Sequence, residues 1–237
     1  MKHFLALVAI AVLTMSCGDD DPTGPADDAV IQIIHNSPST DAAVVDIYLN
    51  DGSAPAVDDL AFQEATGMIE LAAGSYTIGI APGSSTGPGD IIASFGPVDL
   101  DAGSQTVIMA AGELGDDFTL VFNELVTTAT SGNVGLLAFH GSPDAPTVDI
   151  TAEGVGVLVT ALQYLTFQGY IEVPEGDYVL GIGPTGAAPI IEFDVPLSGL
   201  GGSTAVAFAS GYLNGTPGFG LLAALNDGTV VVFAVSQ

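Results

Sequence analysis

Two segments of the chain contain the residue types that a hydrolytic site uses. Residues 35–46 contain His35, Ser37 and Asp46, and residues 140–149 repeat the pattern with His140, Ser142 and Asp149. A Ser-His-Asp site works through geometry, so three such residues within a dozen positions are weak evidence for one. Neither a nucleophile elbow nor an oxyanion-hole motif accompanies them.

The repetition itself favours a structural explanation, since a fold requirement is kept in both copies whereas an active site need not be. We therefore expect no catalytic residue, with hydrolysis as the least favoured function. The residues that we expect to shape each copy are His35, Pro38, Asp46, Tyr76, His140, Pro143, Asp149 and Tyr178.

Carboxylates offer a second kind of chemistry. The pairs Asp58-Asp59 and Asp116-Asp117 and the run at residues 18–21 could give oxygen ligands to Ca²⁺. None follows the spacing of an EF-hand loop, and no Cys/His group has zinc spacing. We expect solvated acidic turns and no cofactor, with a Ca²⁺ site as the weaker alternative.

Sugar chemistry is a third possibility. Glu70 and Glu172 occupy equivalent positions in separate copies, so we do not expect them to face each other as a glycosidase pair. Sugar binding without hydrolysis stays open. The chain has no Trp, and the aromatic residues that could stack on a sugar instead are Tyr48, Tyr164, Tyr170 and Tyr212. The Gly-rich loop at residues 81–90 lacks a Walker Lys; it is the first place where we would look for a ligand.

Charge excludes whole classes of partner. The 237 residues contain 28 carboxylates and one Lys or Arg, which is Lys2, for a net charge of −27. Removal of Lys2 with a signal peptide takes this charge to −27 − 1 = −28. Because phosphate recognition depends on Lys and Arg, we expect no nucleic acid partner and no electrostatic attraction to anionic lipid.

The N-terminus predicts export and anchoring. A cationic start and an apolar run at residues 4–14 precede Cys17, the single Cys, and an acidic, Pro-containing stretch follows it. This resembles a lipoprotein signal, so we expect a signal peptide over 1–16, a lipid on Cys17 and an extended tether over 17–29. With one Cys, no disulfide can form within a chain.

Most of the remaining chain is a duplication. Residues 60–82 align without a gap on residues 162–184, and the matched residues include Gly67 with Gly169 and Tyr76 with Tyr178. Short apolar or alternating segments separated by Gly, Pro, Asn and Asp predict strands throughout. We expect an all-β chain of two tandem immunoglobulin-like β-sandwich domains, over 30–125 and 134–237, joined by a linker at 126–133.

Alternation within one strand predicts which side chains reach the core. Val45, Ile47 and Leu49 should face inward, and Asp46 and Tyr48 outward. Tyr76 and Tyr178 each follow a Gly-containing turn, and both resemble a tyrosine corner, in which the hydroxyl bonds to nearby backbone.

The opening "HGSPDAPTVDI" and the later "VPEGDYVLGI" are close to the pattern of domain-of-unknown-function family 4397, and "LAAGSYTIGI" keeps it in the first copy. The resemblance covers nearly all of residues 30–235. It implies tandem β-sandwiches in secreted or envelope-anchored bacterial proteins, without a known activity.

These observations favour a non-catalytic protein held by a lipid to the outer membrane, more at the cell surface than in the periplasm. The expected role is adhesion, binding or structure, with a surface protein or polysaccharide as partner. The alternative is a periplasmic or surface binder of carbohydrate or another small ligand.

Overall fold

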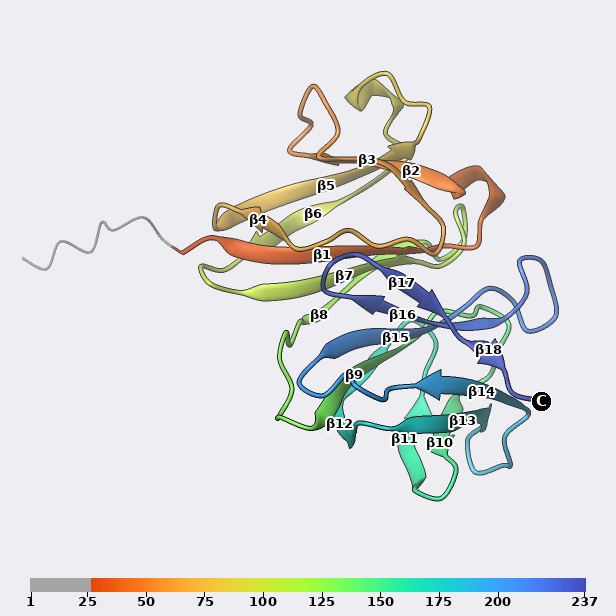
Figure 1. Ribbon diagram of the computed structural model, residues 1–237. Coiled ribbons are helices and arrows are strands. Elements are labelled where there is room, and N and C mark those ends of the chain that lie inside the picture. The colour runs from red at the N-terminus through yellow and green to blue at the C-terminus, as the bar shows by residue number, and fades with distance from the viewer. Residues whose placement is uncertain (1–26) are drawn as a thin grey trace, which may run out of the picture.

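The computed structural model describes residues 27–237, and in this part of the chain all regular structure is β-strand apart from two short 3₁₀ turns, η1 (Thr40–Ala42) and η2 (Pro88–Asp90). Figure 1 shows two stacked units, the first built by β1–β8 and the second by β9–β18. The signal peptide and Cys17 lie outside the described residues. No helix within residues 27–237 has the length and apolar character needed to cross a membrane.

The first unit contains eight strands. They are β1 (Ala29–Asn36), β2 (Val44–Leu49), β3 (Val57–Ala61), β4 (Ile69–Leu71), β5 (Gly74–Pro82), β6 (Ala93–Leu100), β7 (Gln105–Ala111) and β8 (Thr119–Glu124). They form sheet A, in the order β4-β1-β7-β8, and sheet B, in the order β3-β2-β5-β6.

The second unit repeats this arrangement and adds two strands. Its strands are β9 (Asn133–His140), β10 (Val148–Ala152), β11 (Gly156–Leu162), β12 (Phe167–Pro174), β13 (Asp177–Pro184), β14 (Ile191–Pro196), β15 (Thr204–Ser210), β16 (Gly220–Leu225), β17 (Val230–Val232) and β18 (Ala234–Val235). Sheet C has the order β12-β9-β15-β16-β17 and sheet D the order β11-β10-β13-β14-β18. The added β17 and β18 extend one edge of each sheet.

The strand order differs from the immunoglobulin arrangement that we expected. In an immunoglobulin domain the first strand shares a sheet with the second, fourth and fifth. Here β1 lies between β4 and β7, pairs in parallel with β7, and leaves β2 and β5 to the opposite sheet. Composition and periodicity predicted sandwiches correctly, but strand order depends on long-range pairing that periodicity does not encode.

Each unit encloses its own apolar core. Sheets A and B bury Ile31, Ile47, Ile80 and Ile108 between them, and sheets C and D bury Phe193, Leu162 and Ile182, among others. Val45 and Ile47 face this core as predicted. Asp46 and Tyr48 point away from it, yet both are only 1% exposed.

A third apolar core lies between the two units, where sheets A and C face each other. On β7, Ile108 and Ala110 belong to the first unit's core, whereas Val107 and Met109 reach the shared core. The same division holds on β9, where Phe139 joins the shared core and Val134 the core of its own unit. The central strands are thus apolar on both faces, because both faces are covered.

Three amide side chains of the first unit cross this shared core. The Gln32 Nε2 group donates to Leu225 O at 2.7 Å, Asn36 Nδ2 to Ala209 O at 3.1 Å, and Gln63 Nε2 to Ser210 Oγ at 3.0 Å. The equivalent residues of the second unit are Leu137, Gly141 and Leu165.

Gly141 has a steric role in this contact. A Cβ atom at Gly141 would lie 2.0 Å from the Asn36 amide nitrogen and 2.9 Å from Ala209 O. The lack of a side chain at Gly141 therefore leaves room for the Asn36 amide of the first unit to reach Ala209 O of the second.

The shared core predicts that the units unfold together. Phe208 is fully buried in it, so Phe208→Ala should lower the free energy of unfolding by about 3–5 kcal/mol. Hydrogen exchange should show that β1 and β7 of the first unit lose protection together with β15. Val232→Ala, at a side chain 67% exposed, is the control and should change stability by about 0.5 kcal/mol or less. Loss of protection confined to the second unit would contradict the prediction.

Candidate functional site

Backbone groups occupy both ring nitrogens of His35. The ring is fully buried at the end of β1, with Nε2 2.6 Å from Ala42 O and Nδ1 accepting the Ser37 N–H at 3.5 Å. The Ser37 hydroxyl donates instead to Gly112 O at 2.6 Å. His35 therefore closes the turn that follows β1, and Asp46 is not among its hydrogen-bond partners in the described structure.

His140 makes the same contacts in the second unit. Its Nε2 lies 3.0 Å from Pro146 O, and its Nδ1 accepts the Ser142 N–H at 3.3 Å. Burial lowers the pKa of His140, and of His35, below the usual histidine value. A catalytic triad needs the ring between a hydroxyl and a carboxylate. Neither histidine has that arrangement within residues 27–237.

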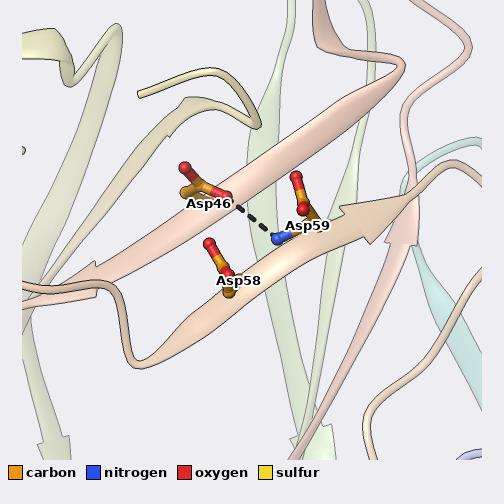
Figure 2. A group of neighbouring side chains, drawn as sticks. All are labelled: Asp46, Asp58 and Asp59. Atoms are coloured by element: carbon orange, nitrogen blue, oxygen red, sulfur yellow. Dashed lines mark hydrogen bonds between the residues drawn. The ribbon is translucent and has the colours of Figure 1, made fainter. Parts of the chain in front are cut away.

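Asp46 ties two neighbouring segments to β2. Its Oδ1 accepts the Asp59 N–H at 2.9 Å, as Figure 2 shows, and its Oδ2 accepts the Ser85 hydroxyl at 2.5 Å. Ser85 also lies 2.7 Å from the Tyr48 hydroxyl. The loop at 83–90 thus covers Asp46 and Tyr48, which explains why two outward-pointing side chains are buried.

Asp149 has the equivalent role in the second unit. Its carboxylate accepts the Ala161 N–H at 2.8 Å and the Gly186 N–H at 2.9 Å, and these bonds lower its pKa. Asp59 and Ala161 are equivalent bulge residues, with φ of 53° and 55°. Each aspartate therefore holds a bulge in the neighbouring strand and one long loop of its own unit.

The remaining motif residues also contact backbone or line turns. The Tyr76 hydroxyl donates to Ala72 O at 2.6 Å, and the Tyr178 hydroxyl to Pro174 O at 2.7 Å. Pro38 is buried and Pro143 half-buried, each directly after its serine.

Asp46, Asp58 and Asp59 form one acidic cluster on β2 and β3 (Figure 2), and their nearest ligand atoms lie within 4.8 Å of one another. Partial desolvation and the charges of Asp59 and Asp46 raise the pKa of Asp58. Three carboxylates could bind a hard cation such as Ca²⁺. However, both Asp46 oxygens already accept hydrogen bonds, and Thr160 and Ala161 replace the other two acids in the second unit. Asp116 and Asp117 lie in a separate turn.

The two glutamates considered for sugar hydrolysis lie on strands of different sheets. Glu70 is exposed on β4. Glu172, on β12, accepts the Thr130 N–H at 3.0 Å and the Asn133 amide at 3.1 Å, which lowers its pKa. Glu172 thereby holds the segment that connects the two units.

Of the four tyrosines considered for sugar stacking, Tyr212 lines a groove between the units. Tyr48 is buried, Tyr164 packs edge-on against His140, and Tyr170 lies over Gly135 and bonds to Thr128 O. The groove has a volume of about 320 Å³. Its walls are Pro38, Ser39, Thr40, Asp41, Glu113 and Leu114 of the first unit and Tyr212 and Thr216 of the second.

A hydrogen bond between the units fixes Tyr212 in this groove. Its hydroxyl donates to Glu113 Oε1 at 2.6 Å, and burial together with this bond and nearby carboxylates raises the pKa of Tyr212 to about 12. Asp144 supports the same loop by accepting the Leu213 and Asn214 N–H groups, at 2.6 and 2.8 Å.

The contact between Glu113 and Tyr212 is not predictable from the sequence. They occupy the same position in the two copies, directly after Gly112 and Gly211, which both have positive φ. A polar residue at this point in both copies was the available signal. Only the packing of sheet A on sheet C shows that the two side chains meet.

The buried histidines predict an acid sensitivity. The pKa of each histidine is lower in the folded than in the unfolded chain. Its contribution to the free energy of unfolding is therefore complete above pH about 6.5 and is lost as the pH falls toward the pKa of the folded state. His35→Gln with His140→Gln keeps a donor near each carbonyl but removes the titration. Between pH 7 and 5.5, wild type should lose up to about 1 kcal/mol more per histidine than the double variant in urea unfolding. An equal loss of stability in wild type and in the double variant would contradict the prediction.

Of the comparisons with known proteins, only the one with family models assigns a family. No curated protein matches the chain. One solved structure, described as "Alpha-glucan binding by a streptococcal virulence factor", aligns over 78% of this chain and 93% of its own at 8% identity, but its TM-score of 0.25 is too low to support an argument. The family described as "Domain of unknown function (DUF4397)" matches residues 29–151 and 136–230. The chain, with its two stacked copies of one sandwich, therefore belongs to the DUF4397 family.

Proposed function

We propose that this protein is a non-catalytic binding module of the cell envelope, held by a lipid on Cys17, and that a neutral saccharide binds in the groove between its units. The observation that carries the proposal is the Tyr212–Glu113 contact. It places an aromatic ring beside carboxylate and hydroxyl groups from both units.

The lack of catalysis is supported by what the repeated motif does in the fold. His35 and His140 are buried against backbone groups, and Asp46 and Asp149 hold bulges and loops. Groups used in this way are not free to accept a substrate proton or to attack a substrate.

The ligand class follows from the groove lining. Ser39, Thr40 and Thr216 offer hydroxyls, and Asp41 and Glu113 offer carboxylates that accept hydrogen bonds from sugar hydroxyls. Tyr212 adds an aromatic surface for a sugar ring. Since no Lys or Arg follows residue 2, an anionic ligand would find no cationic partner, and a neutral polyhydroxylated ligand fits best.

The tether between Cys17 and β1 limits the distance between the membrane and the two units. Eleven residues (18–28) lie between Cys17 and Ala29, the first residue of β1, and the 29 − 17 = 12 steps along the chain reach at most about 40 Å when fully extended. Surface display on the outer membrane is consistent with such a tether and with a strongly acidic, soluble exterior.

Binding can be tested with a glycan array that carries neutral and anionic saccharides. Wild type should bind one or more neutral glycans and no anionic ones. Tyr212→Ala should abolish binding, and Tyr212→Phe should retain part of it because the ring remains. Tyr170→Ala, which removes a ring outside the groove, is the matched control and should bind like wild type. No neutral glycan bound, or binding unchanged in Tyr212→Ala, would reject this ligand class.

Location can be tested with proteinase K on intact cells, followed by immunoblotting. Trypsin is unsuitable because the chain has no Lys or Arg after residue 2. A surface protein should be degraded in intact cells, with lysed cells showing that the folded chain can be cut. Protection in intact cells but not in lysates would place the protein in the periplasm and contradict surface display.

A further inference from the structure

We propose that the free edge of β11 is a self-association site, at which it pairs in antiparallel fashion with β11 of a second copy of this chain. β11 lies at the end of sheet D, next to β10, at the bottom of the view in Figure 1. An edge strand carries a row of N–H and C=O groups that no neighbouring strand satisfies, and another strand is the partner that fits them.

β11 lacks the features that normally protect an edge. Residues 154–162 contain no charged residue and no Pro. Two apolar side chains point into solvent here: Val157 of β11 is 58% exposed, and Val155, in the turn before β11, is 62% exposed. Both lie in or beside the first half of the strand.

The first unit provides an internal comparison. Its equivalent edge strand, β3, has the same bulge but carries Asp58 and Asp59 there, where β11 has Thr160 and Ala161. Like charges brought opposite each other would prevent two β3 strands from pairing. The duplicated fold therefore has one edge protected by acids and one equivalent edge without them.

Charge identifies the second copy as the occupant. The edge strands β3, β4, β6, β8 and β12 each contain a carboxylate, and β17 and β18 are uncharged but only 3 and 2 residues long. β11 has 7 residues. Among the described edges it is the longest at which two strongly acidic chains can meet without placing carboxylates of the strands against each other.

We centre the proposed pair on Val157, the exposed large apolar residue within β11. Val157 lies opposite Thr151 of β10, and an antiparallel pair centred on Val157 sets the two Val157 side chains next to each other. Two five-stranded sheets D then form one continuous sheet. Because each exported chain carries −28 overall, association should strengthen as salt screens the repulsion.

The test is the molar mass in solution, by sedimentation equilibrium at low and high salt. Every sample carries Cys17→Ser, so that no lipid contributes to association. Wild type should approach twice the monomer mass as concentration and salt rise. The edge variant Thr160→Asp/Ala161→Asp, which copies the acids of β3, should remain monomeric while still unfolding in one cooperative thermal transition.

Ser53→Asp/Ala54→Asp is the matched control, because it adds the same charge at exposed positions in the turn before β3. It should dimerise like wild type. A monomeric wild type at all salts, an edge variant that still dimerises, or a control that is as monomeric as the edge variant would each overturn the proposal.

Removing the protection of β3 gives an independent readout. Asp58→Thr/Asp59→Ala should open a second uncharged edge and convert the dimer into larger assemblies at high salt. A variant that stays dimeric would refute the protective role assigned to the two acids.

Discussion

The apolar layer between sheets A and C is the contact on which the rest of the molecule depends. It makes two sandwiches into one stack of four sheets with three cores, and it buries strands such as β1, β7, β9 and β15 on both faces. Residues 27–237 contain no Lys or Arg, so no ion pair between a carboxylate and a Lys or Arg contributes to their stability. Stability must come from apolar burial and hydrogen bonds.

Because residues 27–237 contain no Lys or Arg, their carboxylates bond to other groups. Many of them accept backbone N–H groups at turns and bulges, where a cation would otherwise be the natural partner. Examples are Asp46, Asp90, Asp117, Asp144, Asp149, Glu172 and Asp227. Charge-assisted bonds of this kind are stronger than neutral ones, so the acids that look like surplus charge also fix loops.

The residues that the two copies share and the residues that differ between them have different roles. The shared His residues bond the same two backbone groups in both units, and the shared Asp residues hold equivalent bulges. Several positions that differ lie where the units meet: Gln32 and Asn36 against Leu137 and Gly141 at the shared core, and Glu113 against Tyr212 in the groove. The amides set the register between the units, because their bonds form only when sheet A lies correctly on sheet C. Asymmetry between the copies, rather than the repeated motif, gives this chain its particular surfaces.

The sequence by itself determined the β class, the duplication and the family, because these depend on local periodicity, turn residues and aligned positions. It also contained the near-continuous apolar runs of β1, β7, β9 and β15, which indicate strands buried on both faces. Which surface covers the second face of those strands was not readable from the pattern. Tertiary structure decided that the two units cover each other, that Glu113 and Tyr212 meet in one groove, and that loop 83–90 buries Asp46. The physical reason is that periodicity records how apolar each face of a strand is, whereas strand order and sheet-to-sheet contact depend on residues about a hundred positions apart.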